Sequence, residues 1–113
     1  MTLTAQRLDA DVSVAPQLGP EAMAEAKAAG FRSVINNRPD YEAGPSQPTN
    51  ASVEAAARAA GLEYAYLPVA PNFQSAEEIA RFRELITTMS KPVLAFCRTG
   101  TRSGKLWRAA TAR

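Results

Sequence analysis

The feature that most constrains the fold is a short apolar run, Pro92–Phe96, which leads into Cys97 and then into a segment with helical potential, Ser103–Ala112. Val93–Phe96 shows no alternation of polar and apolar residues, which is typical of a strand covered on both faces. The sequence from the cysteine to the helix is Cys-Arg-Thr-Gly-Thr-Arg-Ser. A buried strand, a glycine-containing loop and a helix together predict a cradle of backbone amides for an anion, with a thiol at its centre.

The rest of the chain alternates between helical and extended segments. Capping residues, prolines and glycines predict three more helices, which begin at Gly19–Glu21, Thr49–Asn50 and the capping box Ser75–Glu78 and end before Gly30, Gly61 and Pro92. Extended segments are predicted over residues 4–8 and 11–15, as a small edge-like hairpin, and over residues 31–36 and 64–67.

Two successive units of helix, glycine and strand indicate a sheet wound with crossover helices. The sequence therefore predicts an α/β fold in a single domain covering residues 1–113: a small, mainly parallel sheet of three or four strands, with helices on both faces and an N-terminal hairpin. The loops that follow parallel strands gather at one edge of the sheet. Residues 37–48, 68–74 and 97–102 are expected to face one another there, and residues 41–50 to form a mobile surface loop, an active-site flap, or both.

Composition narrows the function classes. The net charge is only +2, and the 13 basic residues are scattered, so nucleic-acid binding is not expected. No basic leader or long apolar run is present, and a single cysteine cannot form an internal disulfide, so we expect a cytoplasmic protein that does not bind membranes. The chain has no histidine, which excludes Cys–His and Ser–His–Asp catalysis and any zinc site that needs imidazole. Neither a metal nor a cofactor is expected.

The loop after the apolar run is predicted to be reactive. Amides, a helix amino end and nearby arginines stabilise a thiolate, which is the nucleophilic form of cysteine. Cys97 is therefore predicted to be the nucleophile, and Arg102 to hold two oxygens of a small anion. The other residues of the loop are predicted to bind substrate, with Ser103 donating a hydrogen bond to the thiol: Arg98, Thr99, Gly100, Thr101 and Ser103. The alternative is that Cys97 is only a small buried residue that ends a strand.

Three stretches, in this order, resemble one known family: 34–40 (Val-Ile-Asn-Asn-Arg-Pro-Asp), 66–69 (Tyr-Leu-Pro-Val) and 97–103. They are similar to the phosphatase-like domain of beta-lactamase-hydrolase-like proteins, and the resemblance covers nearly the whole chain. It implies the cysteine-phosphatase fold in a small bacterial protein. Members have been described both as candidate phosphatases and as sulfur transferases, so the resemblance leaves the reaction open.

The active loop departs from that of cysteine phosphatases, which resemble it but carry arginine six positions after the cysteine, usually with histidine before it. Here Arg102 lies five positions after Cys97, and Phe96 stands in the place of the histidine. The loop is one residue shorter and resembles the active loop of many rhodaneses, which transfer sulfur through a cysteine persulfide.

The acid that phosphate-ester cleavage requires is also absent from its usual place. Hydrolysis of a phosphate monoester needs a proton for the leaving alkoxide. In the dual-specificity phosphatases, which the chain resembles in outline, an aspartate follows a segment like Leu67-Pro68-Val69, but here residues 70–72 read Ala-Pro-Asn. Asp40 is the one aspartate expected at this edge. It is either a substitute acid or, as aspartates in turns usually are, a solvated turn former.

These observations favour a sulfurtransferase that attacks a sulfane sulfur with Cys97 and passes it to a thiol acceptor or cyanide. Expulsion of sulfite from thiosulfate needs no proton. The first alternative is a phosphatase-like hydrolase that forms a phosphocysteine, and the second is a module that binds an anion without turning it over. Arg38, in the loop after residues 31–36, is a further candidate ligand of the anion. Homo-oligomerisation is left open.

Overall fold

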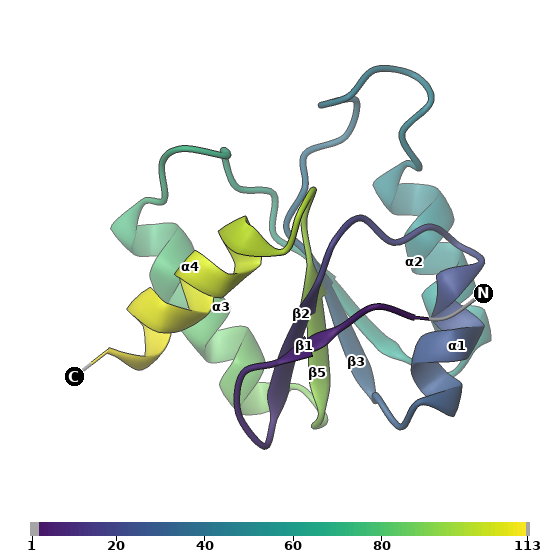
Figure 1. The fold of residues 1–113 in the computed structure, drawn as a ribbon, viewed down its shortest axis with the longest axis horizontal. Helices are drawn as coiled ribbons and strands as arrows, with labels where there is room; N and C mark the ends of the chain where they lie inside the picture. The colour runs from purple at the N-terminus through teal and green to yellow at the C-terminus, as the bar shows by residue number, and fades with distance from the viewer. Residues whose placement is uncertain (1–2, 113) are drawn as a thin grey trace.

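The structure, a computed structural model, describes residues 3–112 and contains one five-stranded sheet with helices on both faces (Figure 1). The strands are β1 (Gln6–Arg7), β2 (Val12–Ala15), β3 (Ser33–Asn36), β4 (Glu63–Tyr66) and β5 (Val93–Phe96). The helices are α1 (Ala22–Ala28), α2 (Asn50–Ala59), α3 (Ala76–Thr88) and α4 (Thr101–Thr111). The predicted α/β class is confirmed.

The strand order is β1-β2-β5-β3-β4, and all neighbours are parallel except β1, which pairs antiparallel with β2. In the register of the parallel strands, Phe96 lies level with both Ala15 and Asn36, and Asn36 lies level with Tyr66. The four parallel strands therefore end together, and the loops that follow them start from one edge.

Strand β5 lies at the centre of the sheet and is covered on both faces, as its unbroken apolar sequence predicts. All four of its residues are buried. Val93 and Ala95 pack with α3 and α4, whereas Leu94 and Phe96 pack with α1 and α2. Figure 1 shows the two helix pairs on opposite sides of the sheet. This layering fixes the position at which β5 delivers Cys97.

The caps predicted for α2 and α3 are also confirmed. The Thr49 hydroxyl accepts a hydrogen bond from the Ser52 amide at 3.2 Å, and this bond starts α2. At the start of α3 the Ser75 hydroxyl accepts from the Glu78 amide at 3.0 Å, and the Glu78 carboxylate accepts from the Ser75 amide at 2.9 Å. No helix within residues 3–112 has the length and apolar character needed to cross a membrane.

The predicted N-terminal hairpin is confirmed, with β1 and β2 paired antiparallel, but its edge-like character holds for only one of its strands. Of the two, β1 lies at an edge of the sheet, whereas β2 is wholly buried and pairs with the central strand β5. The mixed polarity of residues 11–15 suggested an edge-like segment, but β2 has a strand on each side and all four of its residues, Ser13 included, are buried. The sheet thus has four parallel strands and one antiparallel strand.

Helix α4 begins at Thr101, two residues before the predicted start. Gly100 precedes it with φ 91°, a left-handed conformation that costs glycine little and lets the chain turn straight into the helix. Arg102 and Ser103 consequently lie in the first turn of the helix.

Candidate active site

The loops that were predicted to meet at the carboxyl edge of the sheet do so, and hydrogen bonds join them. Arg102, in the first turn of α4, donates to the carbonyl of Val69 at 3.0 Å and to the carboxylate of Glu42. Arg38, after β3, donates to the side chain of Gln17, after β2, at 3.0 Å. The segments that follow the four parallel strands therefore each contribute a residue to one hydrogen-bond network.

Cys97 directly follows β5 and is buried, with 1% of its surface exposed. Its Sγ accepts a hydrogen bond from the backbone amide of Gly100 at 3.1 Å. Immediately after this amide, the left-handed φ of Gly100 turns the chain into α4. An amide donor at the amino end of a helix favours a thiolate, so this geometry is compatible with the predicted role of Cys97 as a nucleophile.

Arg102 is the second element of the predicted cradle, and its side chain is 5% exposed. Nη1 and Nη2 each lie 3.1 Å from an oxygen of Glu42. Nε is buried, and among the described residues it has no hydrogen-bond partner. A buried donor without a partner is costly and rare in native proteins, so an anion that accepted from Nε would complete the hydrogen bonding of this arginine.

Glu42, in the loop between β3 and α2, was not recognised from the sequence. Its Oε1 accepts from Arg38 Nε at 2.9 Å and from Arg102 Nη2 at 3.1 Å, so that one carboxylate joins two buried arginines. Burial pushes the pKa of Glu42 upward, but the hydrogen bonds and charges of Arg102 and Arg38 outweigh burial and hold that pKa below its ordinary value. The carboxylate is therefore ionised at neutral pH.

The loop that carries Glu42 is tied in place by its own side chains. Gln47 is buried, accepts from the Ala43 amide and donates to the Pro39 carbonyl, both at 2.9 Å. The spacing of Arg38 and Glu42, four residues apart, was the one signal that could have indicated the pair. A spacing of four residues brings side chains together in a helix, and because this loop has no helical pattern, the signal was too weak to place the two side chains together.

Comparison with known proteins identifies the family. Residues 5–113 match the family model for the beta-lactamase hydrolase-like protein, phosphatase-like domain. The chain belongs to this family. A beta-lactamase hydrolase-like protein from Xylella fastidiosa (strain Temecula1) is 44% identical over 78 residues, which are 69% of this chain and 18% of that protein. The chain thus spans about a fifth of the length of this curated relative.

Solved structures agree with this membership. A protein of Neisseria meningitidis Z2491, described as a candidate phosphatase, is 35% identical with a TM-score of 0.83, and the match covers 90% of this chain and 72% of that one. TpbA from P. aeruginosa, solved as a C132S variant in complex with pTyr, is 14% identical with a TM-score of 0.68 over 94% of this chain and 62% of its own. The second likeness concerns the fold alone. The chain has a cysteine-phosphatase-like fold.

Within this family fold, Ser103 does not bond to the thiol as predicted. Its hydroxyl donates to Asn37 Oδ1 at 2.8 Å, and Asn37 in turn donates to the carbonyl of Leu67 at 3.0 Å. The earlier start of α4 brings Ser103 beside the residue that follows β3. Through Asn37, Ser103 thus connects the start of α4 to the segments that follow β3 and β4.

Asp40, for which a substitute acid and a turn former were the two alternatives, makes structural hydrogen bonds. Its Oδ1 accepts from the amide of Asn50 at 2.7 Å, at the start of α2, and its own amide donates to the Tyr66 hydroxyl at 2.9 Å. These contacts agree with the turn-forming alternative, because the carboxylate of Asp40 accepts a hydrogen bond at the amino end of α2. Arg38 is buried and is engaged with Gln17 and Glu42, so it supports Glu42 in the resting site.

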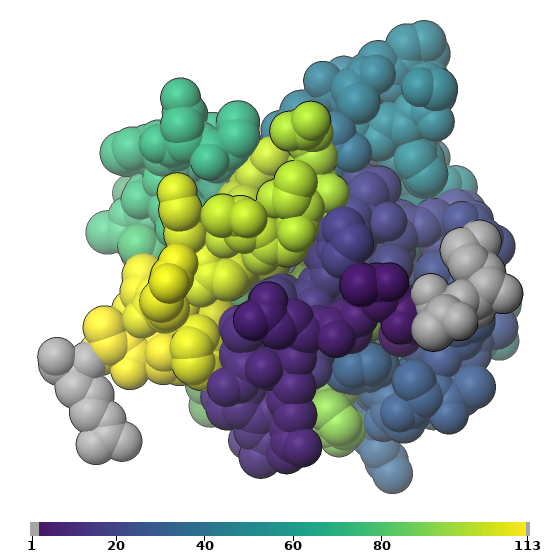
Figure 2. Space-filling view, in the orientation of Figure 1, coloured from purple at the N-terminus to yellow at the C-terminus, as the bar shows by residue number. Residues whose placement is uncertain are grey.

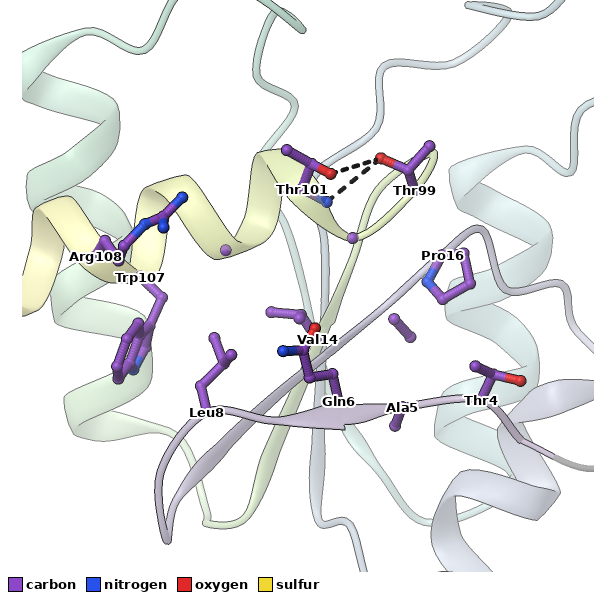
Figure 3. Close-up of a pocket in the computed structure, with 13 residues that line it drawn as sticks. Thr4, Ala5, Gln6, Leu8, Val14, Pro16, Thr99, Thr101, Trp107 and Arg108 are labelled. Atoms are coloured by element: carbon purple, nitrogen blue, oxygen red, sulfur yellow. Dashed lines mark hydrogen bonds between the residues drawn. The ribbon is translucent and has the colours of Figure 1, made fainter.

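The remaining loop residues lie at the surface. Arg98, Thr99 and Thr101 are exposed, and the two threonine hydroxyls are 3.1 Å apart. Thr99 and Thr101 lie on the rim of a hollow of about 520 Å³ between α4 and the first two strands (Figure 3), with Leu8 and Trp107 farther along it. Neither Cys97 nor Arg102 lines this hollow. Within residues 3–112, no three His, Cys, Asp or Glu side chains are grouped so as to hold a metal ion.

Proposed function

We propose that the protein is a cysteine-dependent hydrolase of phosphate monoesters, in which Cys97 is the nucleophile and Arg102 binds the phosphoryl group. The observation that carries the proposal is the pairing of a buried thiol under the Gly100 amide with a buried arginine whose Nε lacks a partner among the described residues. Membership of a phosphatase-like family and the cysteine-phosphatase-like fold support this reaction over others.

In the proposed reaction the Cys97 thiolate attacks phosphorus, a phosphorus–sulfur bond forms, and the bond to the leaving oxygen breaks with its electron pair. Water then attacks the phosphocysteine, releasing inorganic phosphate and the thiolate. The Gly100 amide stabilises the sulfur before attack and as it leaves, and Arg102 stabilises the charge on the phosphoryl oxygens. To bind the phosphoryl group with its two Nη atoms, Arg102 must break its hydrogen bonds to the Glu42 carboxylate.

The same site lacks an obvious acid for the leaving oxygen. The Asp40 carboxylate is bonded to the start of α2, residues 70–72 carry no carboxyl group, and Glu42 is ionised by its arginines. We therefore expect the preferred substrates to have stable leaving groups, such as phenolates, because these depart without full protonation.

Sulfur transfer is the second candidate, and the missing acid is the observation that favours it. The Cys97 thiolate would attack the sulfane sulfur of thiosulfate, the sulfur–sulfur bond would break, and sulfite would leave with the electron pair. An acceptor thiolate would then take the outer sulfur of the Cys97 persulfide and release the Cys97 thiolate. The five-residue step from Cys97 to Arg102 also favours this reaction, because a shorter loop leaves less room for a tetrahedral phosphate.

One experiment separates these functions. The protein is incubated in parallel with 4-nitrophenyl phosphate and with thiosulfate, and phenolate release and the mass of the protein are measured. We expect phenolate release that is lost in Cys97→Ser and strongly reduced in Arg102→Lys. Arg58→Lys, an exposed pair partner on α2, is the control that keeps full activity.

If Cys97 gains one sulfur atom and no phosphate ester is cleaved, the proposed function is wrong and the reaction is sulfur transfer. If neither reaction occurs but phosphate raises the melting temperature, the domain is an anion-binding module.

A further inference from the structure

The hollow between α4 and the first two strands is separate from the candidate active site, although it touches the same loop. Its volume of about 520 Å³ lies within the range of about 300–1,000 Å³ that is typical of small-molecule sites. In Figure 2 it opens on the face where α4, in yellow, lies beside β1, in purple. Gly100 and Thr101 line it, whereas Cys97 and Arg102 do not. The hollow therefore adjoins the active loop without containing the predicted nucleophile or its arginine.

The lining of the hollow is mainly apolar, with a few polar groups. Val14 and Ala15 of β2 are buried and belong to this lining, and Leu8 and Trp107 lie together at one end (Figure 3). Trp107 is held there by a hydrogen bond from its Nε1 to the carboxylate of Asp9 at 3.2 Å. Apolar walls with a small number of polar groups are the usual composition of a site for a small molecule.

Gly104 leaves space in the hollow at a cost to the helix that carries it. It lies in the interior of α4, where glycine is less favourable than alanine, and it lines the hollow. Apart from its own helix backbone and its chain neighbours, no atom lies within 4 Å of the position that an added Cβ would take. The packing of the described residues therefore does not require glycine here. A molecule bound in the hollow would require it, because a side chain at position 104 would occupy the same space.

The charge around the hollow is positive. Arg108 is the one ionisable residue in its lining, and within residues 3–112 it makes no ion pair. Every charged side chain of α4 is basic, and no acid follows Glu84 in the sequence. Asp9, near one end of the hollow, already accepts hydrogen bonds from two backbone amides at 2.8 Å. The hollow thus offers an apolar surface and one cation that the described residues leave unpaired.

We propose that this hollow binds a small molecule with an apolar body and a single anionic group, which Arg108 holds while the body lies against Trp107 and Leu8. The inference does not depend on the proposed hydrolysis. Tyr41 and Phe73, the two exposed large apolar side chains of residues 3–112, do not line the hollow. It therefore lacks the protruding apolar residues that anchor a protein in a membrane surface or in the centre of a protein interface. A small carboxylate fits its volume and its single charge.

The test uses Trp107, the only tryptophan of the chain, because its fluorescence reports on the hollow directly. The fluorescence is followed as octanoate is added, and octylamine, which carries a positive charge on the same tail, is the matched ligand. Gly104→Leu fills the hollow and Arg108→Gln removes its cation. Lys105→Gln is the matched control, because it removes a charge from an exposed residue of α4 that does not line the hollow.

We expect saturable binding of octanoate that is about fivefold tighter than the binding of octylamine. Arg108→Gln should weaken the binding of octanoate about three- to fivefold, whereas Lys105→Gln should change it by less than about twofold. Gly104→Leu should weaken it by about tenfold or more. The melting temperature of Gly104→Leu should equal or exceed that of the wild type, because leucine is the better helix former and the space beside it is open.

The absence of a saturable response, equal binding of the two ligands, or undiminished binding of octanoate to Gly104→Leu would overturn the inference. If light scattering finds a dimer that Gly104→Leu separates into monomers, a second copy of the chain fills the hollow and the inference is also wrong. None of these results bears on the proposed hydrolase, whose test depends on Cys97 and Arg102.

Discussion

Replacing Glu42 with glutamine should weaken the resting fold and strengthen anion binding at the same time. Glu42 accepts three hydrogen bonds from two buried guanidinium groups. The amide retains one oxygen but turns a donor toward an arginine and leaves both cations without their counter-charge. Removing one partner of a buried ion pair costs about 3–5 kcal/mol. Because the Glu42 side chain is 21% exposed and glutamine still accepts, we expect about 2 kcal/mol, or a fall in melting temperature of roughly 8 °C.

The gain in anion binding follows from the same contacts. In the resting site the two Nη atoms of Arg102 are occupied by the Glu42 carboxylate, which an incoming anion must displace. Without this internal competitor, sulfate should bind at least about threefold more tightly, and its stabilising effect should grow accordingly.

The assay is thermal unfolding at pH 7 and low ionic strength, over a series of sulfate concentrations. Glu54→Gln is the matched control, because Glu54 makes an exposed ion pair with Arg58 on α2, and such pairs contribute about 0–1 kcal/mol. A Glu42→Gln variant with wild-type stability and an unchanged sulfate response would refute the reasoning that Glu42 occupies Arg102.

The pH dependence gives a second check. The folded protein lowers the pKa of Glu42 below its ordinary value of 4.5, so its contribution to stability is complete above that value and is lost as the pH falls through the lower, folded pKa. The stability difference between the wild type and Glu42→Gln should therefore be full at pH 7 and narrow below about pH 4.5. A difference that grew in acid would contradict the sign of the shift.

Three further outcomes are expected. Ser103→Ala leaves the buried Asn37 oxygen without its donor and should cost about 1–3 kcal/mol in urea unfolding, while the alkylation rate of Cys97 stays unchanged because the hydroxyl does not bond to sulfur. Gly104→Ala, in the interior of α4 with no atom within 4 Å of the added Cβ, should raise stability by about 0.5–1 kcal/mol. Alkyl phosphates should be cleaved about a hundredfold or more slowly than 4-nitrophenyl phosphate, measured as kcat/KM, because the site has no placed acid; equal rates would reveal one.

Regular elements were predictable because their signals are local. The unbroken apolar run in β5 identified a strand buried on both faces, and the Ser75 and Thr49 caps located the starts of α3 and α2. The hairpin was predicted in its place, but the position of β2 inside the sheet was not, because it depends on pairing with β5, which is 81 positions away in the register Val12 to Val93. Sequence spacing contains no information about that pairing.

The site was predictable where its residues follow one another and unpredictable where a long loop supplies them. Cys97, Gly100 and Arg102 are fixed by one strand, one turn and one helix, and their arrangement follows from those elements. Glu42 lies in a loop whose sequence has neither helical nor strand periodicity, and its partner Arg102 lies 60 residues further along the chain. The hydroxyl of Ser103 was predicted to donate to Cys97, which is close in sequence, but it donates to Asn37, which lies 66 positions away and follows β3.

The Glu42 contact also bears on the choice between hydrolysis and sulfur transfer. An arginine that holds a carboxylate in the resting state gives up those bonds when an anion arrives, and the exchange is most favourable for an anion that accepts several hydrogen bonds with high charge. A phosphate monoester dianion replaces the carboxylate with more charge, and it also offers an oxygen to the unpartnered Nε of Arg102. Thiosulfate spreads its charge over sulfur as well as oxygen and competes less well for the same guanidinium. In the proposed reaction the internal carboxylate would therefore favour a phosphoryl group over thiosulfate, the missing acid would favour a leaving group that needs no proton, and an aryl phosphate would satisfy both conditions.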